Sequence, residues 1–220
     1  MFSKKQTILI FLAFLTIKIN AQEIIYDATL NYKVSVNSDN DKNISKLFEG
    51  ASYKIYLKGL LSKTELKTSL GSETSIYDGK ENRGAILKEY SNQKLMINMN
   101  EDSWNKKNKS SHQLQFDEEK DKIEIINGIS CKRAIAHDTK GSTIVVYFNP
   151  ALILFNSAYN NCFSSIKGIP IRYEQHLTNG TKYIYSLINI DYEIISSNKF
   201  ELPKSGYRII NYEEANKIEN

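Results

Sequence analysis

The sequence is poor in the residue patterns that catalytic and metal sites need. None of its three histidines, His112, His137 and His176, has another histidine or a cysteine at the spacing of zinc ligands. The chain also has no Gly-x-Ser-x-Gly motif and no glycine-rich loop of the kind that holds a phosphate. Its carboxylates are numerous but scattered, so they do not define a pair of acids for hydrolysis. We therefore expect no enzyme activity, no metal and no cofactor.

Cysteine is almost absent, since only Cys131 and Cys162 occur in 220 residues. A chain of this length can bury a sufficient core without several disulfides or a structural metal. In an oxidising compartment the two could form a disulfide worth about 3–4 kcal/mol on the loop-entropy model. They could equally be two separate thiols in the core. A nucleophilic Cys131 acting with His137 or His176 is disfavoured, because in a strand the neighbouring Lys132 points to the opposite face.

Only one long apolar run occurs, at residues 7–17 near the N-terminus. It is shorter than the roughly 20 residues that a helix needs to cross a bilayer. Two lysines precede it and Ala21, a small residue, follows, which is the order found in a secretory signal peptide. We predict that residues 1–21 are a signal peptide cleaved near Ala21. The mature chain, residues 22–220, is then a single periplasmic or secreted domain that does not span the membrane.

Most of the net charge lies in this N-terminal segment. The chain has 29 basic and 25 acidic residues, a net charge of +4. Lys4, Lys5 and Lys18 account for three of these four charges, so the mature chain carries a net charge of +1. The remaining charges of both signs are mixed along the sequence and form no clustered basic face. Nucleic acid is therefore not an expected partner.

Much of the mature chain shows the two-residue period of β-strands. Seven apolar side chains occupy every second position from Ile24 to Val36, which predicts a long strand with one buried face. Residues 144–148 (IVVYF) are apolar throughout, which predicts a strand covered on both faces. Asp78-Gly79 and Asn179-Gly180 predict hairpin turns. The expected fold class is mainly β (α+β).

Three segments need separate interpretation. Residues 101–122 are polar with little periodicity and are expected to form a mobile loop or an extended hairpin. After Pro150, four apolar side chains recur at spacings of three and four, which predicts a short helix. They are Leu152, Phe155, Tyr159 and Phe163. This stripe is either an apolar lid or ordinary core. Arg172, Glu174 and His176 share one strand face, which favours the solvated outer side of a sheet over a binding site.

The second half of the chain resembles a known group of secreted proteins. The resemblance rests on GISCKRA at 128–134, IVVYF at 144–148, GIPI at 168–171 and SNKFELPKSGY at 197–207. In this order the segments resemble the GLPGLI-type and DUF4412-type secreted proteins of Bacteroidetes. The chain departs from the family's second Gly-Leu step, since Ile171 and Arg172 follow Pro170.

This resemblance implies an architecture similar to the periplasmic lipoprotein carriers of the LolA, LolB and LppX type. Such a fold is a single curved antiparallel sheet, or half-barrel, around an apolar cavity with a short helical lid. The implied role is non-catalytic binding of an acyl chain or a lipoprotein, in which each buried CH₂ contributes about 0.8 kcal/mol. The stripe after Pro150 would be the lid, and the expected wall residues combine apolar bodies with some polar tips. They are Tyr26, Leu30, Tyr147, Tyr173 and Tyr185.

Two other functions stay open from the sequence. The sheet could be filled by its own side chains and act as an envelope interaction or scaffold domain, with an edge strand or residues 101–122 recruiting outer-membrane proteins. An envelope hydrolase is the weakest alternative. It would need a polar cleft joining Cys131, His176 or a pair of carboxylates, and no pattern in the sequence shows one.

Overall fold

The computed structural model describes residues 22–219, apart from positions 92, 113, 158 and 160. The predicted signal peptide, residues 1–21, lies outside the described residues. The strands are β1 (Glu23–Ile25), β2 (Asp27–Ser38), β3 (Ser52–Lys58), β4 (Leu61–Thr68), β5 (Gly71–Asp78), β6 (Arg83–Tyr90), β7 (Gln93–Asn100), β8 (Asp117–Ile126), β9 (Ile129–His137), β10 (Thr143–Asn149), β11 (Leu152–Leu154), β12 (Ile169–His176), β13 (Thr181–Asp191) and β14 (Arg208–Asn211). The helices are α1 (Lys42–Leu47), α2 (Glu101–His112) and α3 (Tyr212–Glu219), with 3-10 turns η1 (Asn161–Phe163) and η2 (Ser197–Phe200).

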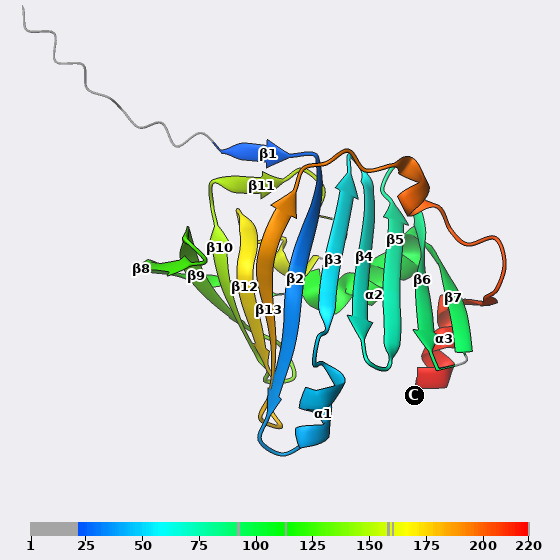
Figure 1. Cartoon of the computed structure of the whole chain (residues 1–220), viewed down its shortest axis with the longest axis horizontal. Helices are drawn as coiled ribbons and strands as arrows, with labels where there is room; N and C mark the ends of the chain where they lie inside the picture. Colours follow the sequence, from blue (N-terminus) through cyan, green and yellow to red (C-terminus); the bar gives the residue numbers. More distant parts are fainter. Residues whose placement is uncertain (1–21, 92, 113, 158, 160, 220) are drawn as a thin grey trace, which may run out of the picture.

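Twelve strands form one curved sheet in the order β14-β7-β6-β5-β4-β3-β2-β13-β12-β10-β9-β8 (Figure 1). Neighbouring strands are antiparallel except β14 and β7, which are parallel. β14 and β8 are the two edges, so the sheet does not close on itself. β1 and β11 form a small parallel sheet across one end of the large one. The prediction of a mainly β fold with a single curved sheet is confirmed.

The local sequence explains the strands and turns well. In β2 the side chains at even positions from Ala28 to Val36 are buried, and those between are not. In β10 the adjacent Val145 and Val146 are both buried, as expected for a strand covered on both faces. Gly180 has a φ of 83° in the β12–β13 turn, a conformation that glycine adopts without steric cost. These sequence predictions are confirmed.

The curved sheet presents a concave face and an outer face. In Figure 1, α2 lies behind β3, β4 and β5, on the concave face. It contacts β6 and β7 near one edge and η1 on the other side. On the outer face, the chain after β13 crosses β3–β7 and packs its Ile195 and Phe200 against a buried cluster. The cluster residues on the sheet are Tyr56, Ile76, Ala85, Leu87 and Met96.

The predicted helix after Pro150 is wrong. Residues Leu152–Leu154 instead form β11, which pairs in parallel with β1. The Glu23 amide donates to the Ala151 carbonyl at 2.7 Å, and the Phe155 amide donates to the Ile25 carbonyl at 2.9 Å. Among the described residues that follow, up to β12, the helical element is the 3-10 turn η1. The distant strand β1 thus satisfies the backbone hydrogen-bonding groups of residues whose apolar spacing predicted a helix.

Residues 101–122 also differ from the expected loop or hairpin. Their first part is α2, and their last part belongs to β8, which pairs with β9. The start of α2 is fixed by two reciprocal hydrogen bonds. The Ser103 amide donates to Asn100 Oδ1, and the Asn100 amide donates to Ser103 Oγ, both at 2.9 Å. This exchange satisfies backbone donors at the helix N-terminus, as in a capping box.

Candidate functional site: an aromatic pocket on the concave face

An aromatic cluster occupies the concave face where β2, β3, β12 and β13 lie side by side. Strand register places Tyr32 opposite Tyr53 and Tyr173 opposite Tyr185. The Tyr173 and Tyr185 rings stack with centroids 4.4 Å apart and an angle of 9°, and the Phe163 ring meets Tyr173 at 4.9 Å. These contacts, with Tyr32 and Tyr53 each 6.1 Å or less from a neighbouring ring, make one continuous aromatic surface. We call these five residues the aromatic cluster.

A pocket of about 220 Å³ opens between this cluster and the residues that cover it. Its lining comes from β3, β4, β10, η1, β12 and β13, and consists of Tyr53, Leu66, Ile144, Cys162, Phe163, Tyr173, Gln175 and Tyr185. Ligand pockets commonly measure about 300–1,000 Å³. This pocket is therefore small, with room for a short apolar segment.

The cover over the concave face is α2 together with η1. Trp104 of α2 is 3% exposed and stacks on Tyr77 of β5, with ring centroids 4.3 Å apart. Asn108, one turn later, is also buried and donates to the Trp104 carbonyl at 2.9 Å. Leu114, just after the helix, packs in the same cluster as Phe163. The helix on the concave face is thus α2, in the segment expected to be a loop or an extended hairpin.

The pocket holds neutral groups at neutral pH. Burial raises the pKa of Tyr185 to about 12, and burial also raises the pKa values of Tyr53 and Tyr173. The Tyr32 hydroxyl donates to the Pro170 carbonyl at 2.8 Å. Burial raises the pKa of the Cys162 thiol to about 12, so this side chain stays protonated and is a poor nucleophile. The site is an apolar wall with hydroxyl tips.

Some of the residues singled out from the sequence come together here. Tyr173, Tyr185 and Phe163 line the pocket. Tyr159 and Leu152 pack beside the adjoining core, in which Leu30 is fully buried. The sequence stripe therefore supplied part of the cover, although not as a helix.

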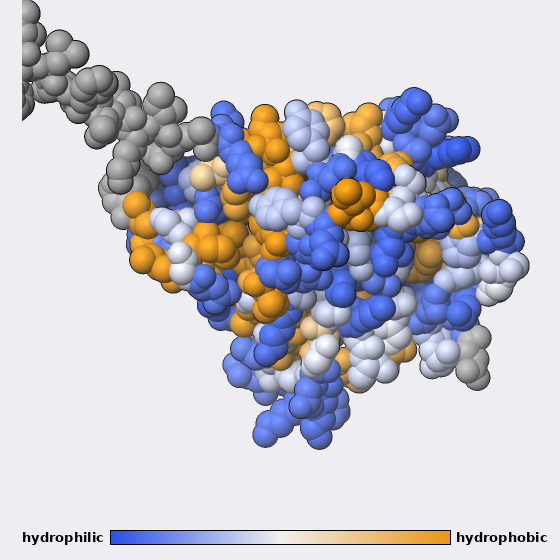
Figure 2. Space-filling view, turned by 45° about the horizontal axis from the view of Figure 1, so that its top comes forward, coloured by the Kyte–Doolittle hydropathy of each residue, from blue (hydrophilic) through white to orange (hydrophobic). Residues whose placement is uncertain are grey.

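The other candidates lie elsewhere. Tyr26 and Phe155 are 53% and 47% exposed, and their rings contact each other with centroids 4.5 Å apart at an angle of 30°, next to the β1–β11 sheet. Figure 2 shows hydrophobic surface gathered at this end of the molecule. Tyr147 points to the outer face, where its ring lies 5.8 Å from the Arg133 guanidinium and 6.0 Å from that of Arg172. The one-residue alternation of a strand explains this, because Val146 takes the concave side.

Sequence reasoning missed several pocket residues. Tyr53 belongs to an alternating strand and was not separated from ordinary core positions. Leu66, Gln175 and Cys162 come together only through strand order. The signal that was available for α2 was its cap, since Asn100 and Ser103 stand three residues apart, and Glu101 and Asp102 follow the cap in the first turn.

The two cysteines lie in different clusters. Cys131 belongs to the core around Leu30, and Cys162 packs beside the cluster that contains Phe163. Among the described residues both are thiols rather than a disulfide. Burial raises the pKa of Cys131 to about 11. Within the described part of the chain, no group of three or more histidine, cysteine or acidic residues could hold a metal ion.

On the outer face, Arg172, Glu174 and His176 form a tighter cluster than a row of solvated charges. The Glu174 side chain is only 9% exposed and contacts Arg172, His176 at 2.9 Å and Lys182 at 3.5 Å. Burial alone would raise the pKa of Glu174, but the His176 hydrogen bond and the charges of Arg172 and Lys182 lower it below its usual value. The cluster is an ion-pair network on the sheet and is separate from the pocket.

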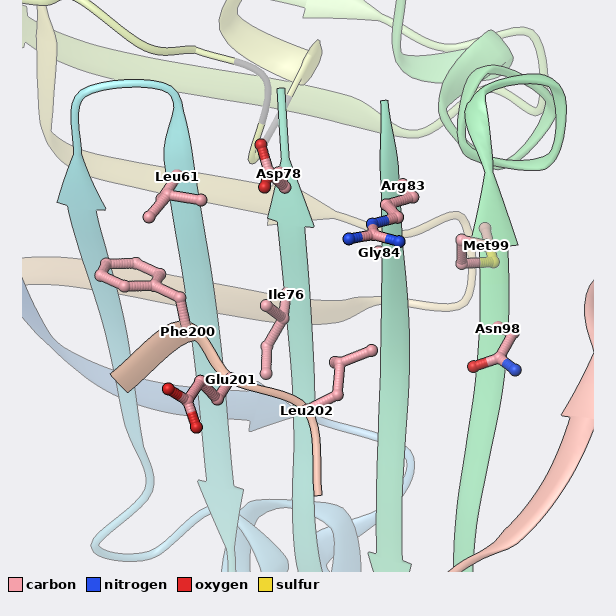
Figure 3. A pocket seen from close by; sticks show the side chains of 10 residues that line it. All are labelled: Leu61, Ile76, Asp78, Arg83, Gly84, Asn98, Met99, Phe200, Glu201 and Leu202. Atoms are coloured by element: carbon pink, nitrogen blue, oxygen red, sulfur yellow. The ribbon is translucent and has the colours of Figure 1, made fainter. Parts of the chain in front are cut away.

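A second hollow, of about 500 Å³, lies beside the C-terminal segment (Figure 3). Figure 3 shows residues 200–202 running past β4 and β5, with Phe200 and Leu202 beside Leu61 and Ile76. Phe200 itself is part of the buried cluster under this segment. We refer to this hollow as the outer groove.

Comparison with known proteins places the fold but not the family. No protein-family model matches the chain, and no curated protein matches its sequence. An uncharacterized conserved protein from Thermus thermophilus is similar over 83% of this chain and 90% of its own, with a TM-score of 0.51 and 10% identity. At that identity the likeness shows a shared fold. The resemblance to GLPGLI-type and DUF4412-type proteins stays a prediction.

Two further solved structures are similar at lower TM-scores. A LolA superfamily protein from Nitrosomonas europaea matches over 80% of this chain and 90% of its own, with a TM-score of 0.36 and 9% identity. PNGF-II matches over 88% of this chain but only 33% of its own, with a TM-score of 0.47 and 11% identity. In the part of the chain that the structure describes, the helices are too short or too polar to cross a bilayer.

Proposed function

We propose that the protein is a non-catalytic carrier that binds one hydrocarbon chain, from a lipid or a lipoprotein, in the concave pocket. The proposal includes the periplasm or the extracellular space as its location. The observation that carries it is the pocket on the concave face, which Tyr53, Phe163, Tyr173 and Tyr185 of the aromatic cluster line. Aromatic rings offer a large apolar area, and their hydroxyl tips keep the wall compatible with water when it is empty.

The energetics suit reversible binding. Each methylene that leaves water contributes about 0.8 kcal/mol, so a chain segment of eight carbons gains roughly 6 kcal/mol before the cost of association. A pocket of about 220 Å³ takes only part of a long chain. A longer chain therefore extends beyond this pocket.

A titration with 1-decanol tests this function. Native mass spectrometry of the protein with 1-decanol measures binding directly. The variant Leu66→Trp fills the pocket from β4, and we expect it to weaken 1-decanol binding at least tenfold. The matched control is Leu202→Trp in the outer groove, which should bind as the wild type does. Equal binding by Leu66→Trp, or no binding by the wild type, contradicts the proposal.

A filled interaction domain is the second candidate function. The small volume of the pocket favours it, and so does the edge strand β8, where Ile123 and Ile125 are 71% and 77% exposed. An unpaired edge with apolar side chains can accept a strand from a partner, such as an outer-membrane protein. The same titration separates the two functions, because a domain of this kind leaves 1-decanol unbound.

A further inference from the structure

Exposed apolar side chains gather at the end of the sheet that β1 and β11 cross (Figure 2). Each of them is between 47% and 95% exposed, and Ile194 is the most exposed. We call this set the apolar end, and its members are Ile24, Tyr26, Phe155, Tyr192 and Ile194. Large apolar side chains concentrated on one part of a surface are typical of an interaction site.

The members of the apolar end come from segments that meet at the start of β2. The rings of Tyr26 and Phe155 contact each other with centroids 4.5 Å apart. The Lys58 ammonium donates to the Ile195 carbonyl at 2.6 Å, and strand register places Lys58 opposite Asp27. The chain that leaves β13 is thus held beside the residues that join β1 to β2.

Four carboxylates stand among these apolar side chains in the sequence. They are Glu23, Asp27, Asp191 and Glu193. Within the described ranges, none of the four takes part in an ion pair. Asp27 accepts a hydrogen bond from the Gly59 amide and Asp191 accepts one from the Glu193 amide, both at 2.9 Å. Backbone contacts therefore hold two of these acids in place while their charge stays available to a partner.

The small sheet at this end also has free edges. β1 and β11 contain three residues each and pair only with each other. A two-stranded sheet presents unpaired backbone groups on both sides, and such an edge can take up a further extended strand. The apolar end thus combines exposed apolar side chains, carboxylates and backbone groups that a strand can reach.

The charge of this end decides which partner fits. An anionic lipid surface attracts basic segments and repels acidic ones. A second copy of the chain, docked through the same surface, would bring the four acids against one another. Lys63 and Lys199 do not lie among these acids, because their ammonium groups lie over the Tyr56 ring, on the adjoining outer face. A partner with apolar and basic side chains matches both parts of the surface.

We propose that the apolar end docks an extended segment of a partner protein in which apolar side chains alternate with lysine or arginine. The apolar side chains of the segment pack on Tyr26, Phe155 and Ile194, and its basic side chains reach the four carboxylates. Its backbone pairs with the small sheet. This interaction surface is separate from the concave pocket and does not depend on the carrier function.

The peptide KIKVKIKVK, labelled with fluorescein, serves as the probe of this surface. Fluorescence anisotropy measures its binding to the protein, residues 22–220. We expect the peptide to bind at least about tenfold more tightly than its acidic counterpart EIEVEIEVE or its polar counterpart KSKTKSKTK. Because exposed charges contribute, raising NaCl from about 50 to 500 mM should weaken the binding of KIKVKIKVK.

Variants of exposed residues separate the apolar from the charged contribution. Ile194→Ser should weaken binding of KIKVKIKVK about tenfold, because a large apolar contact is lost. The side chain of Ile194 is 95% exposed, so its replacement leaves the core intact, which circular dichroism checks. The double variant Glu23→Gln with Glu193→Gln should weaken binding about fivefold and reduce its dependence on salt.

The matched controls lie on α3. Ile218 is 64% exposed and the Glu213 side chain is 63% exposed, so Ile218→Ser and Glu213→Gln make the same chemical changes away from the apolar end. Both should keep the wild-type affinity for the peptide. Equal weakening by the α3 variants, equal binding of the acidic peptide, or no binding of KIKVKIKVK overturns the proposal.

Two further measurements address the other occupants of this surface. Sedimentation of the protein with vesicles of phosphatidylglycerol tests a membrane, and analytical ultracentrifugation of the protein alone tests a second copy. Vesicle binding or a dimer that is lost in Ile194→Ser would overturn the proposal, since the surface would then belong to that occupant. The carrier function stands or fails separately, on the binding of 1-decanol.

Discussion

At the scale of single residues, the outer face contains a strongly constrained acid. Glu174 is surrounded by Arg172, His176 and Lys182, each with a side chain 37–39% exposed. Buried ion pairs cost several kcal/mol to break, whereas exposed pairs contribute less than about 1 kcal/mol. This network lies between those limits, because only the acid is buried.

Replacing Glu174 by glutamine removes the anion and leaves the three basic side chains facing one another. We expect Glu174→Gln to lower the free energy of unfolding by about 2 kcal/mol at pH 7. The pKa of Glu174 is lower in the folded than in the unfolded chain, so its contribution is present above the ordinary value near 4.5 and is lost as the pH falls below it. Urea unfolding between pH 7 and pH 3 measures this, and the two proteins should converge at the acid end. A difference that does not change with pH would contradict the assignment.

The sequence distinguished faces of strands better than it distinguished functions of residues. Tyr173 and Tyr185, expected to lie together on the concave face, both line the concave pocket. Tyr147 was expected beside them, but its neighbours in register are Arg133 and Arg172 on the outer face. A single strand shows which residues alternate, but which face is concave depends on how the whole sheet curves. That curvature is a property of twelve strands together and is not encoded in any one of them.

At the scale of elements, α2 depends on its first turn. Its cap is the exchange between Asn100 and Ser103, and its main anchor on the sheet is Trp104. The helix is otherwise polar, so its packing energy comes from few side chains. An element held in this way opens more readily than a core strand.

Asn100→Ala should loosen this cover without altering the pocket lining. Loss of an N-cap side chain costs about 1 kcal/mol, which corresponds to roughly fivefold faster hydrogen exchange by local opening. Mass spectrometry of peptides covering residues 101–108 measures the rate. Asn105→Ala is the control, since Asn105 is exposed on the same helix. Unchanged exchange in Asn100→Ala would mean that the tertiary contacts alone hold α2.

Two elements, α2 and β11, were not predicted from the sequence. α2 has little apolar periodicity, because Trp104 is the one apolar residue in its sequence, so the pattern gave no helix. The residues after Pro150 had helical spacing, but β1 supplied a strand partner from the other end of the chain. In both cases a long-range contact decided the local conformation, and long-range contacts are what a local pattern omits.

At the scale of the whole molecule, the C-terminal segment completes the outer face. Ile195 and Phe200 cover apolar residues of β3–β7, and the Lys58 ammonium donates to the Ile195 carbonyl at 2.6 Å. β14 then adds a parallel edge beside β7, and Ala215 of α3 packs into the cluster around Trp104. The last part of the chain thus packs against both faces of the sheet.

Phe200→Ala tests this dependence. Phe200 is 7% exposed, and truncation of a buried phenylalanine costs about 3–5 kcal/mol because it removes apolar contacts and leaves a cavity. Leu202→Ala is the control two residues away; Leu202 is 38% exposed, and its truncation should cost less than about 1 kcal/mol. Urea denaturation at pH 7 compares them. Similar losses for the two variants would show that the segment does not act as a core element.

The pairing of β2 with β13 has a consequence for the order in which the chain can acquire its structure. Ser38 and Thr181 hydrogen bond across this seam although they are 143 residues apart. The strands β3–β7 pair with their immediate successors and need only short loop closures, whereas the seam needs almost the full chain. Contacts of such separation slow folding. During synthesis from the N-terminus, one edge of β2 therefore stays unpaired until β13 has been made. The concave pocket is then among the last features of the molecule to form.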